Sequence, residues 1–175
     1  MSLQGLFNPL MNVYVMCVCV CVCVCVCVCV CPAVLCVCDG VRFGQLCSGN
    51  PTNRRRTSDG WGQGHYGAGR GDRDHKGLDI VCEDGSDVLA PFDVTLHGEV
   101  NVFPEPHQAA INSGLSLRGQ GLCFKLFAIR PDRTSGLVRK GDRIGTMLPM
   151  QSVYRGITSH VHVQMCDKSD PTPYF

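Results

Sequence analysis

The chain has 175 residues, with 16 lysines and arginines against 15 aspartates and glutamates, and its formal net charge is +1. This balance offers no electrostatic basis for nucleic-acid binding, which usually requires a basic face and a high isoelectric point. The 14 cysteines would suggest a disulfide-rich scaffold if they were evenly spread, but ten of them lie between Cys17 and Cys38. The N-terminal quarter of the chain therefore differs in kind from the rest.

The first segment, residues 1–45, is dominated by a strict Cys-Val repeat from Cys17 to Cys31. A TG dinucleotide repeat read in frame encodes this alternation, so we interpret the segment as low-complexity sequence from a wrong gene model. Three functional interpretations fit less well. The uncharged run 13–38 is long enough to span a membrane but contains a proline, and residues 1–12 lack the basic residues of a signal peptide. Alternation also places the thiols on one strand face, unlike a C-x-x-C metal site.

Residues 46–175 have the composition of a single folded domain. A chain of this length can bury roughly two-thirds of its unfolded surface, which is enough for a hydrophobic core. Short apolar runs with little helical periodicity recur along it, separated by Gly, Pro and Asp, and each is typical of a strand. They cover residues 78–82, 87–92, 94–100, 114–119, 122–129, 143–149 and 160–165.

This pattern predicts an all-β fold, a compact antiparallel β sandwich or barrel-like domain. The polar, glycine-rich segment 48–71 is expected to form an irregular N-terminal arm.

Four widely spaced cysteines remain in this domain: Cys47, Cys82, Cys123 and Cys166. Because no C-x-x-C pattern is present, their number favours two disulfides in a secreted domain. Sequence alone allows three pairings, and four buried free thiols in a cytosolic protein are the alternative.

Two short histidine motifs carry the candidate chemistry. His75 and Asp79 would lie about 13 Å apart in a fully extended strand, so they can reach one metal only if the chain curls, as Gly77 permits. His160 and His162 would share one face of a strand, roughly 6.5 Å apart. We predict that His75, Asp79 and His162 bind zinc, a ligand set that leaves a fourth position open, with His160 beside that position.

The alternative is that these are ordinary surface or turn histidines, because either motif alone arises often by chance. A zinc ion in such a site acidifies its bound water to a pKa of about 7 and polarises carbonyl groups, which would make amide hydrolysis possible. His160 is the candidate catalytic residue for that case.

Four motifs together resemble the lysostaphin-type zinc endopeptidases: HKGLD from His75, GSDVLAPF from Gly85, VRKGDRIGTM from Val138 and SHVHVQ from Ser159. The resemblance covers residues 46–175 and is strongest to a secreted vertebrate signalling branch built on the peptidase fold. It implies a compact antiparallel β domain with zinc on His75, Asp79 and His162. It also implies the disulfides Cys47–Cys82 and Cys123–Cys166.

Two departures from the family pattern bear on function. The signalling branch carries a third disulfide in its arm, and the two positions here are Ser58 and Gln63. Active peptidases use a further histidine near the end of a central strand, where this chain has Phe127-Ala128-Ile129. Loss of one general base or oxyanion donor typically lowers a rate by roughly 10²–10⁴. The resemblance therefore implies a signalling protein without peptidase activity.

Three classes of function follow: a secreted zinc-binding signal that recruits leukocytes through cell-surface receptors, a zinc endopeptidase that cleaves bacterial cell-wall peptides, and a structural zinc domain. The expected location is extracellular, with no membrane span and no nucleic-acid partner.

Arg54-Arg55-Arg56 could contact sulfated glycans, although a solvated charge run explains it as well. Arg70-Gly71-Asp72 matches the integrin-binding tripeptide, a motif common by chance.

Overall fold

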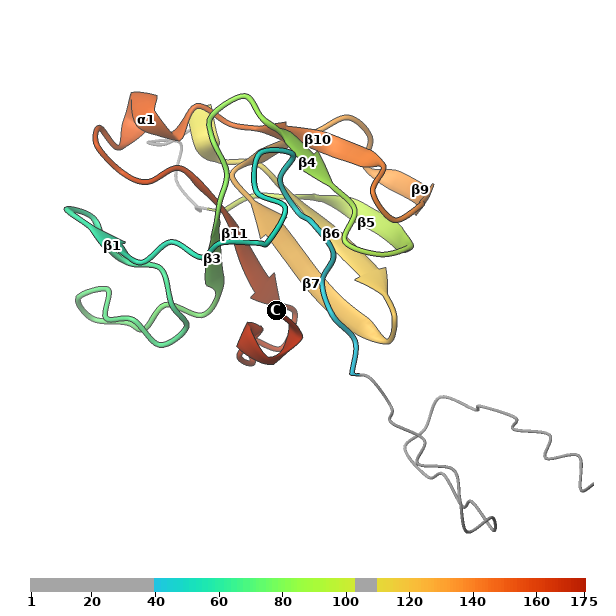
Figure 1. Ribbon diagram of the computed structural model, residues 1–175, viewed down its shortest axis with the longest axis horizontal. Coiled ribbons are helices and arrows are strands. Elements are labelled where there is room, and N and C mark those ends of the chain that lie inside the picture. The colour runs from blue at the N-terminus through green and yellow to red at the C-terminus, as the bar shows by residue number, and fades with distance from the viewer. Residues whose placement is uncertain (1–39, 103–109) are drawn as a thin grey trace, which may run out of the picture. The chain divides into compact units, whose positions relative to one another are not determined.

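The computed structural model describes residues 40–102 and 110–175, which belong to a compact unit that runs from Asp39 to Phe175. The Cys-Val repeat and His107 lie outside the described residues. The strands are β1 (Ser58–Asp59), β2 (Gly62–Gln63), β3 (Leu78–Val81), β4 (Asp87–Leu89), β5 (Val94–Val100), β6 (Gly114–Gly119), β7 (Leu122–Phe127), β8 (Ile129–Pro131), β9 (Ser135–Val138), β10 (Arg143–Met147) and β11 (His160–Met165), and the helices are α1 (Met150–Val153) and the 3-10 helix η2 (Thr172–Tyr174) (Figure 1). No helix in this part of the chain is long and apolar enough to cross a membrane.

Two antiparallel sheets build the domain. One has six strands in the order β3-β11-β7-β6-β5-β9, the other has three in the order β4-β10-β8, and β1 and β2 form a separate hairpin. In β5, Val94 and Leu96 are buried while Thr95 and His97 are exposed, as expected for a strand with one face on the core. One hydrophobic cluster draws side chains from both sheets. The predicted all-β antiparallel fold is thus confirmed.

The chain passes from one sheet to the other at Ala128. This residue has a φ of 63°, in the left-handed region that residues other than glycine seldom adopt. It lies between β7, which pairs with β6 and β11, and β8, which pairs with β10. The apolar run that the sequence presents as one strand therefore forms two strands in different sheets.

The N-terminal boundary of the domain lies before the predicted residue 46. Phe43 is buried, with its ring centroid 4.8 Å from that of Phe124 and 4.7 Å from that of Phe175. Its backbone N–H donates to the carbonyl of Tyr174 at 2.8 Å. The sequence boundary is too late because a single aromatic residue next to a low-complexity segment gives no periodic signal.

The N-terminal arm is paired to the sheet along the outer strand β3. The backbone of Arg55 forms an isolated bridge with Ile80, and the Arg56 N–H donates to the Asp79 carbonyl at 2.9 Å. A sheet edge leaves a row of unpaired backbone groups, and the arm covers that row here. The arm is therefore more regular than its composition indicates.

Two disulfides cross-link the domain. Cys47 joins Cys82 at the end of β3, and Cys123 joins Cys166 just after β11. These are the pairings that the family resemblance implies.

The β1–β2 hairpin carries the two positions at which a third disulfide is expected in relatives. Ser58 and Gln63 are register partners across this hairpin, and directly opposed residues lie close together. A cross-strand disulfide at these two positions would therefore have only a short distance to span.

Candidate metal centre

The sheet order places the predicted ligands in one row. β11 lies between β3 and β7, with His162 opposite Asp79 on β3 and opposite Phe127 on β7. Directly opposed residues point to the same face of a sheet. His75 comes from the segment that leads into β3, so two motifs 87 residues apart meet at one point.

The three predicted ligands offer atoms that converge tightly. His75 Nε2 lies 2.9 Å from His162 Nδ1 and 3.1 Å from Asp79 Oδ1, and His162 Nδ1 lies 3.0 Å from the same oxygen. The side chains of His75 and Asp79 are nearly buried, and that of His162 is 20% exposed. The group is therefore compact and reachable from one side.

The hydrogen bonding of His75 leaves its Nε2 free to act as a ligand. Its Nδ1 lies 2.7 Å from the carbonyl oxygen of His65. A carbonyl only accepts, so Nδ1 carries the proton and Nε2 presents a lone pair. A metal-ligating histidine commonly donates its other ring N–H to such a group.

The donor set fits a zinc ion. A tetrahedral zinc with bonds of about 2.0–2.2 Å separates its ligand atoms by about 3.3–3.5 Å, close to the 2.9–3.1 Å observed. Two imidazole nitrogens and a carboxylate oxygen are also the ligand types that catalytic zinc sites use. Converging lone pairs are satisfied by a cation, and the residues present can hold one.

Gly77 contributes space as well as a bend. A Cβ atom built on it would lie 2.4 Å from His162 Nε2 and 2.5 Å from the carbonyl oxygen of Val163. Its φ is not in the left-handed region, so the need for glycine here is the close approach of β11. The sequence predicts that glycine at this position lets the chain curl, whereas the structure requires it for close packing.

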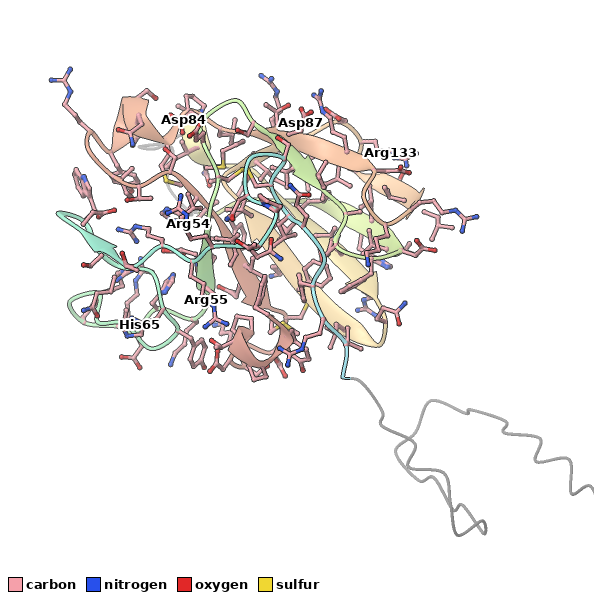
Figure 2. All side chains as sticks on the ribbon, viewed as in Figure 1. Arg54, Arg55, His65, Asp84, Asp87 and Arg133 are labelled. Carbon is pink, nitrogen blue, oxygen red and sulfur yellow. A yellow bond between two sulfur atoms is a disulfide. The ribbon has the colours of Figure 1, made fainter. Side chains whose placement is uncertain are left out.

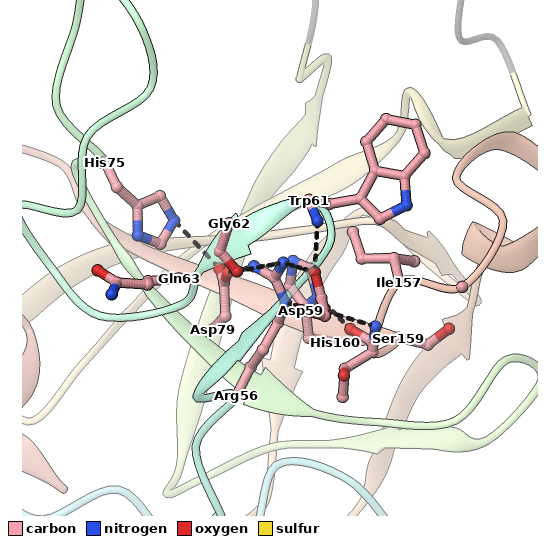
Figure 3. A network of polar contacts seen from close by, with 12 residues as sticks. Arg56, Asp59, Trp61, Gly62, Gln63, His75, Asp79, Ile157, Ser159 and His160 are labelled. Carbon is pink, nitrogen blue, oxygen red and sulfur yellow. Dashed lines mark hydrogen bonds and ion pairs between the residues drawn. The ribbon is translucent and has the colours of Figure 1, made fainter.

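Arg56 corrects the interpretation of residues 54–56 as a solvated charge run. Arg54 and Arg55 are exposed (Figure 2), whereas the side chain of Arg56 is only 2% exposed. Its Nη1 donates to Asp79 Oδ2 at 3.0 Å, and its Nε and Nη2 donate to the two oxygens of Asp59 at 2.9 and 2.6 Å (Figure 3). A buried guanidinium thus joins a predicted ligand to the arm.

These contacts shift the pKa values of the three groups. Burial alone would raise the pKa of Asp79, but its contacts with the imidazoles of His162 and His75 hold it well below its usual range. The hydrogen bonds from Arg56 lower the pKa of Asp59 despite its partial burial. Burial opposes the charge of Arg56, yet its bonds to Asp59 and Asp79 raise its pKa overall. All three groups are therefore ionised at neutral pH.

His160 faces the far oxygen of the shared carboxylate. Its Nε2 lies 3.3 Å from Asp79 Oδ2, and its Nδ1 lies 2.7 Å from the carbonyl of Thr158. Burial lowers the pKa of His160, although Asp79 partly offsets this effect. The ring of Phe127 has its centroid 5.7 Å from that of His162, in the strand region where active peptidases are expected to carry a histidine.

The Arg70-Gly71-Asp72 tripeptide is not presented as an extended recognition motif. Arg70 turns inward, where Nη2 donates to the carbonyl of Gln63 and lies 4.0 Å from Asp79 Oδ2. Gly71 and Asp72 are exposed. Its arginine is therefore engaged with the metal-centre network.

The sequence predicted neither the contact of Arg56 with the candidate ligand Asp79 nor any role for Asp59. An arginine followed three residues later by an aspartate is a weak signal in a polar arm. Their importance arises because Arg56 contacts Asp79, 23 residues away, and Asp59 contacts Arg56.

Comparisons with known proteins agree with this architecture. No protein-family model matches the chain. It is 45% identical over 132 residues to "Leukocyte cell-derived chemotaxin-2" of Mus musculus, and the match covers 75% of this chain and 86% of that protein. It is also 45% identical over 129 residues to the Bos taurus protein of the same name, and this match covers 74% of this chain and 84% of that protein. "Myeloid protein 1" of Gallus gallus is 48% identical over 131 residues, which cover 73% of this chain and 39% of that protein.

A solved structure from Helicobacter pylori shares the fold. Csd3 of Helicobacter pylori matches with a TM-score of 0.51 and 17% identity, covering 78% of this chain and 33% of that one. A peptidase M23 of Pseudomonas aeruginosa is found with a TM-score of 0.34 and 19% identity, over 71% of this chain and 48% of that one. On the strength of the sequence identities and their coverage, the chain belongs to the leukocyte cell-derived chemotaxin-2 family.

Proposed function

We propose that this protein is a secreted, zinc-binding signalling protein that recruits leukocytes through cell-surface receptors. The observation that carries the metal assignment is the convergence of His75 Nε2, Asp79 Oδ1 and His162 Nδ1 within 3.1 Å of one another. When bound, zinc acts as a Lewis acid and adds its binding free energy to the stability of the fold. His75 comes from the segment that leads into β3, and the other two ligands come from the adjacent strands β3 and β11, so binding holds these segments together.

Two observations support a signal rather than a peptidase. Phe127 occupies the row beside His162, and a phenyl ring cannot exchange a proton or stabilise an oxyanion. His160, the candidate catalytic residue, has one ring nitrogen at the Thr158 carbonyl and the other at Asp79 Oδ2. Among the described residues, His160 is thus the remaining candidate base at the metal centre, and it lacks the partner histidine that the family resemblance assigns to active peptidases.

Secretion and leukocyte recruitment are supported by family and by cysteine chemistry. The mouse and bovine relatives are named as leukocyte-derived chemotaxins. Two disulfides in a domain of this size are typical of proteins that fold in an oxidising compartment. Exposed Arg54 and Arg55 would suit sulfated glycans as secondary partners.

The proposal is tested with the purified domain, residues 39–175, produced in an oxidising host. We expect one zinc per chain by elemental analysis, migration of leukocytes toward the protein, and no cleavage of peptidoglycan-type peptide bridges. Hydrolysis that a chelator stops and zinc restores would instead support the endopeptidase. Zinc uptake with neither migration nor hydrolysis would reduce the site to a structural one.

A further inference from the structure

All three nitrogens of the Arg56 guanidinium donate hydrogen bonds although the group lies inside the domain. Besides Asp79 and Asp59, its Nη2 also donates to the carbonyl of Gly62 at 2.9 Å. A buried charge persists only where it is paired and hydrogen-bonded. Arg56 therefore connects β3, the hairpin turn and the arm through one rigid group (Figure 3).

The two oxygens of Asp79 have different partners. Oδ1 faces His75 Nε2 and His162 Nδ1, whereas Oδ2 faces Arg56 Nη1 at 3.0 Å and His160 Nε2 at 3.3 Å. Because Oδ2 is held by the guanidinium, the carboxylate plane is set and only Oδ1 is turned toward the other two ligands. Arg70 is a weaker candidate for this task, since its Nη2 lies 4.0 Å away and its side chain is 24% exposed.

Asp59 extends the connection to a second pair of segments. Its Oδ1 accepts the backbone N–H of Trp61 at 2.9 Å, and its Oδ2 accepts that of Thr158 at 2.8 Å. Trp61 lies in the hairpin turn, and Thr158 lies two residues before His160 at the start of β11. The chain of contacts thus runs from Asp79 through Arg56 and Asp59 to both segments.

We propose that Arg56 is a positioning residue that orients Asp79 for the metal and couples metal loading to the β1–β2 hairpin. The inference rests on the proposed zinc site. The planar guanidinium fork engages two carboxylates in fixed directions, which the single ammonium of a lysine cannot reproduce. Partners of this kind typically change metal affinity 10–100-fold when they are mutated.

Trp61 provides an internal reporter of this coupling. It is the only tryptophan, its ring is tilted against Tyr154 with centroids 5.0 Å apart, and its indole N–H donates to the carbonyl of Arg155 at 2.9 Å. Its emission therefore reports the hairpin and the segment after α1 directly. It does so independently of any activity of the loaded protein.

The test compares residues 39–175 with the variants Arg56→Gln and Arg56→Lys. Zinc affinity is measured by competition with a chromophoric chelator, and Trp61 emission is followed during zinc titration. We expect the wild type to show an emission change that saturates at one zinc per chain. Both variants should bind zinc 10–100-fold more weakly, and cobalt(II) loading should give an altered visible spectrum because the ligand geometry has changed.

Two matched controls separate position from charge. Arg55→Gln removes a neighbouring exposed arginine, and Arg139→Gln removes an arginine that is 75% exposed and pairs with Asp93; both should retain wild-type affinity and emission change. Equal losses in Arg55→Gln would overturn the inference, because the effect would then follow net charge. If Arg56→Lys keeps the full zinc affinity and the full emission change, the inference is overturned as well.

Asp59→Asn keeps the inference testable if the Arg56 variants do not fold. It preserves the bond between Arg56 and Asp79 but weakens the link to the hairpin. Zinc should still bind within a few-fold of wild type, while the emission change is lost; an intact emission change would refute the coupling. If wild-type protein binds no zinc, the proposed function fails first, whereas zinc binding that is insensitive to residues 56 and 59 contradicts only this inference.

Discussion

Asp79 shows at the residue scale how a charge is tolerated within a strand. Its side chain is 1% exposed, and all four residues of β3 are buried. An unpaired buried carboxylate costs several kcal/mol, but this one faces a guanidinium and three imidazoles. The same surroundings that make its burial possible also direct one oxygen to the metal centre.

His162→Ala should abolish zinc binding. Zinc present at about 1,000 times its dissociation constant stabilises a protein by about 4 kcal/mol, and the variant should lose this increment. The measurement is the melting temperature with and without zinc, together with the zinc content. His97→Ala, an exposed histidine on β5, is the control and should behave as wild type; a full zinc complement in His162→Ala would contradict the assigned ligand.

Asp59 should make stability depend on acid pH. Its pKa in the folded protein is lowered by Arg56, so its contribution is fully present above the unfolded value of about 3.9. It is lost as the pH falls from there toward the lower folded value. Asp59→Asn should therefore be less stable than wild type at pH 7, and the difference should shrink below about pH 4. Urea denaturation across this range measures it, and a constant difference would rule out the mechanism.

At the scale of elements, the central position of β11 decides the site. It pairs with β3 on one side and with β7 on the other, so one strand brings His162 to Asp79 and Phe127 at once. Close packing of the segment before β3 against β11 then brings His75 within reach. This approach depends on the absence of a side chain at Gly77.

Gly77→Ala should displace the ring of His162 and weaken zinc binding. The new methyl group would lie 2.4 Å from His162 Nε2 and 2.5 Å from a backbone oxygen, and such overpacking typically costs about 1–3 kcal/mol. Gly49→Ala is the matched control, because a Cβ there meets nothing within 4 Å. Chelator competition and thermal unfolding measure the two effects, and wild-type affinity in Gly77→Ala would show that the site adjusts freely.

For the whole molecule, the two ends of the domain are joined by aromatic packing. Phe43 contacts Phe92, Phe124 and Phe175, and its backbone pairs with that of Tyr174. Residues that precede the predicted boundary are thus part of the core. A truncation must respect this contact rather than the end of the compositional bias.

A protein that starts at residue 39 should fold, whereas one that starts at residue 46 should be destabilised. Loss of a buried phenylalanine typically costs about 3–5 kcal/mol, and the shorter protein loses Phe43. Phe43→Ala in the longer protein is the control for the aromatic contribution alone. Denaturant midpoints of the three proteins provide the comparison, and equal stability of the two truncations would show that Phe43 contributes little.

The sequence by itself determined the fold class and the candidate ligands. Short apolar runs bounded by Gly, Pro and Asp predict antiparallel strands because both the runs and their turn residues are local features. His75, Asp79, His160 and His162 were identified from short spacings for the same reason. The sequence did not predict the passage between sheets at Ala128 or the role of Phe43, since both depend on packing between distant segments.

Only the tertiary structure decided how these residues act together. It paired His162 with Asp79 across β11 and β3, buried Arg56 beside them and turned Arg70 inward. The contact of Arg56 with Asp79 joins residues 23 positions apart and that of His75 with His162 joins residues 87 positions apart, and no local pattern encodes them. Whether an arginine is solvated or buried depends on which charges the fold brings to it, and that is a property of the assembled core.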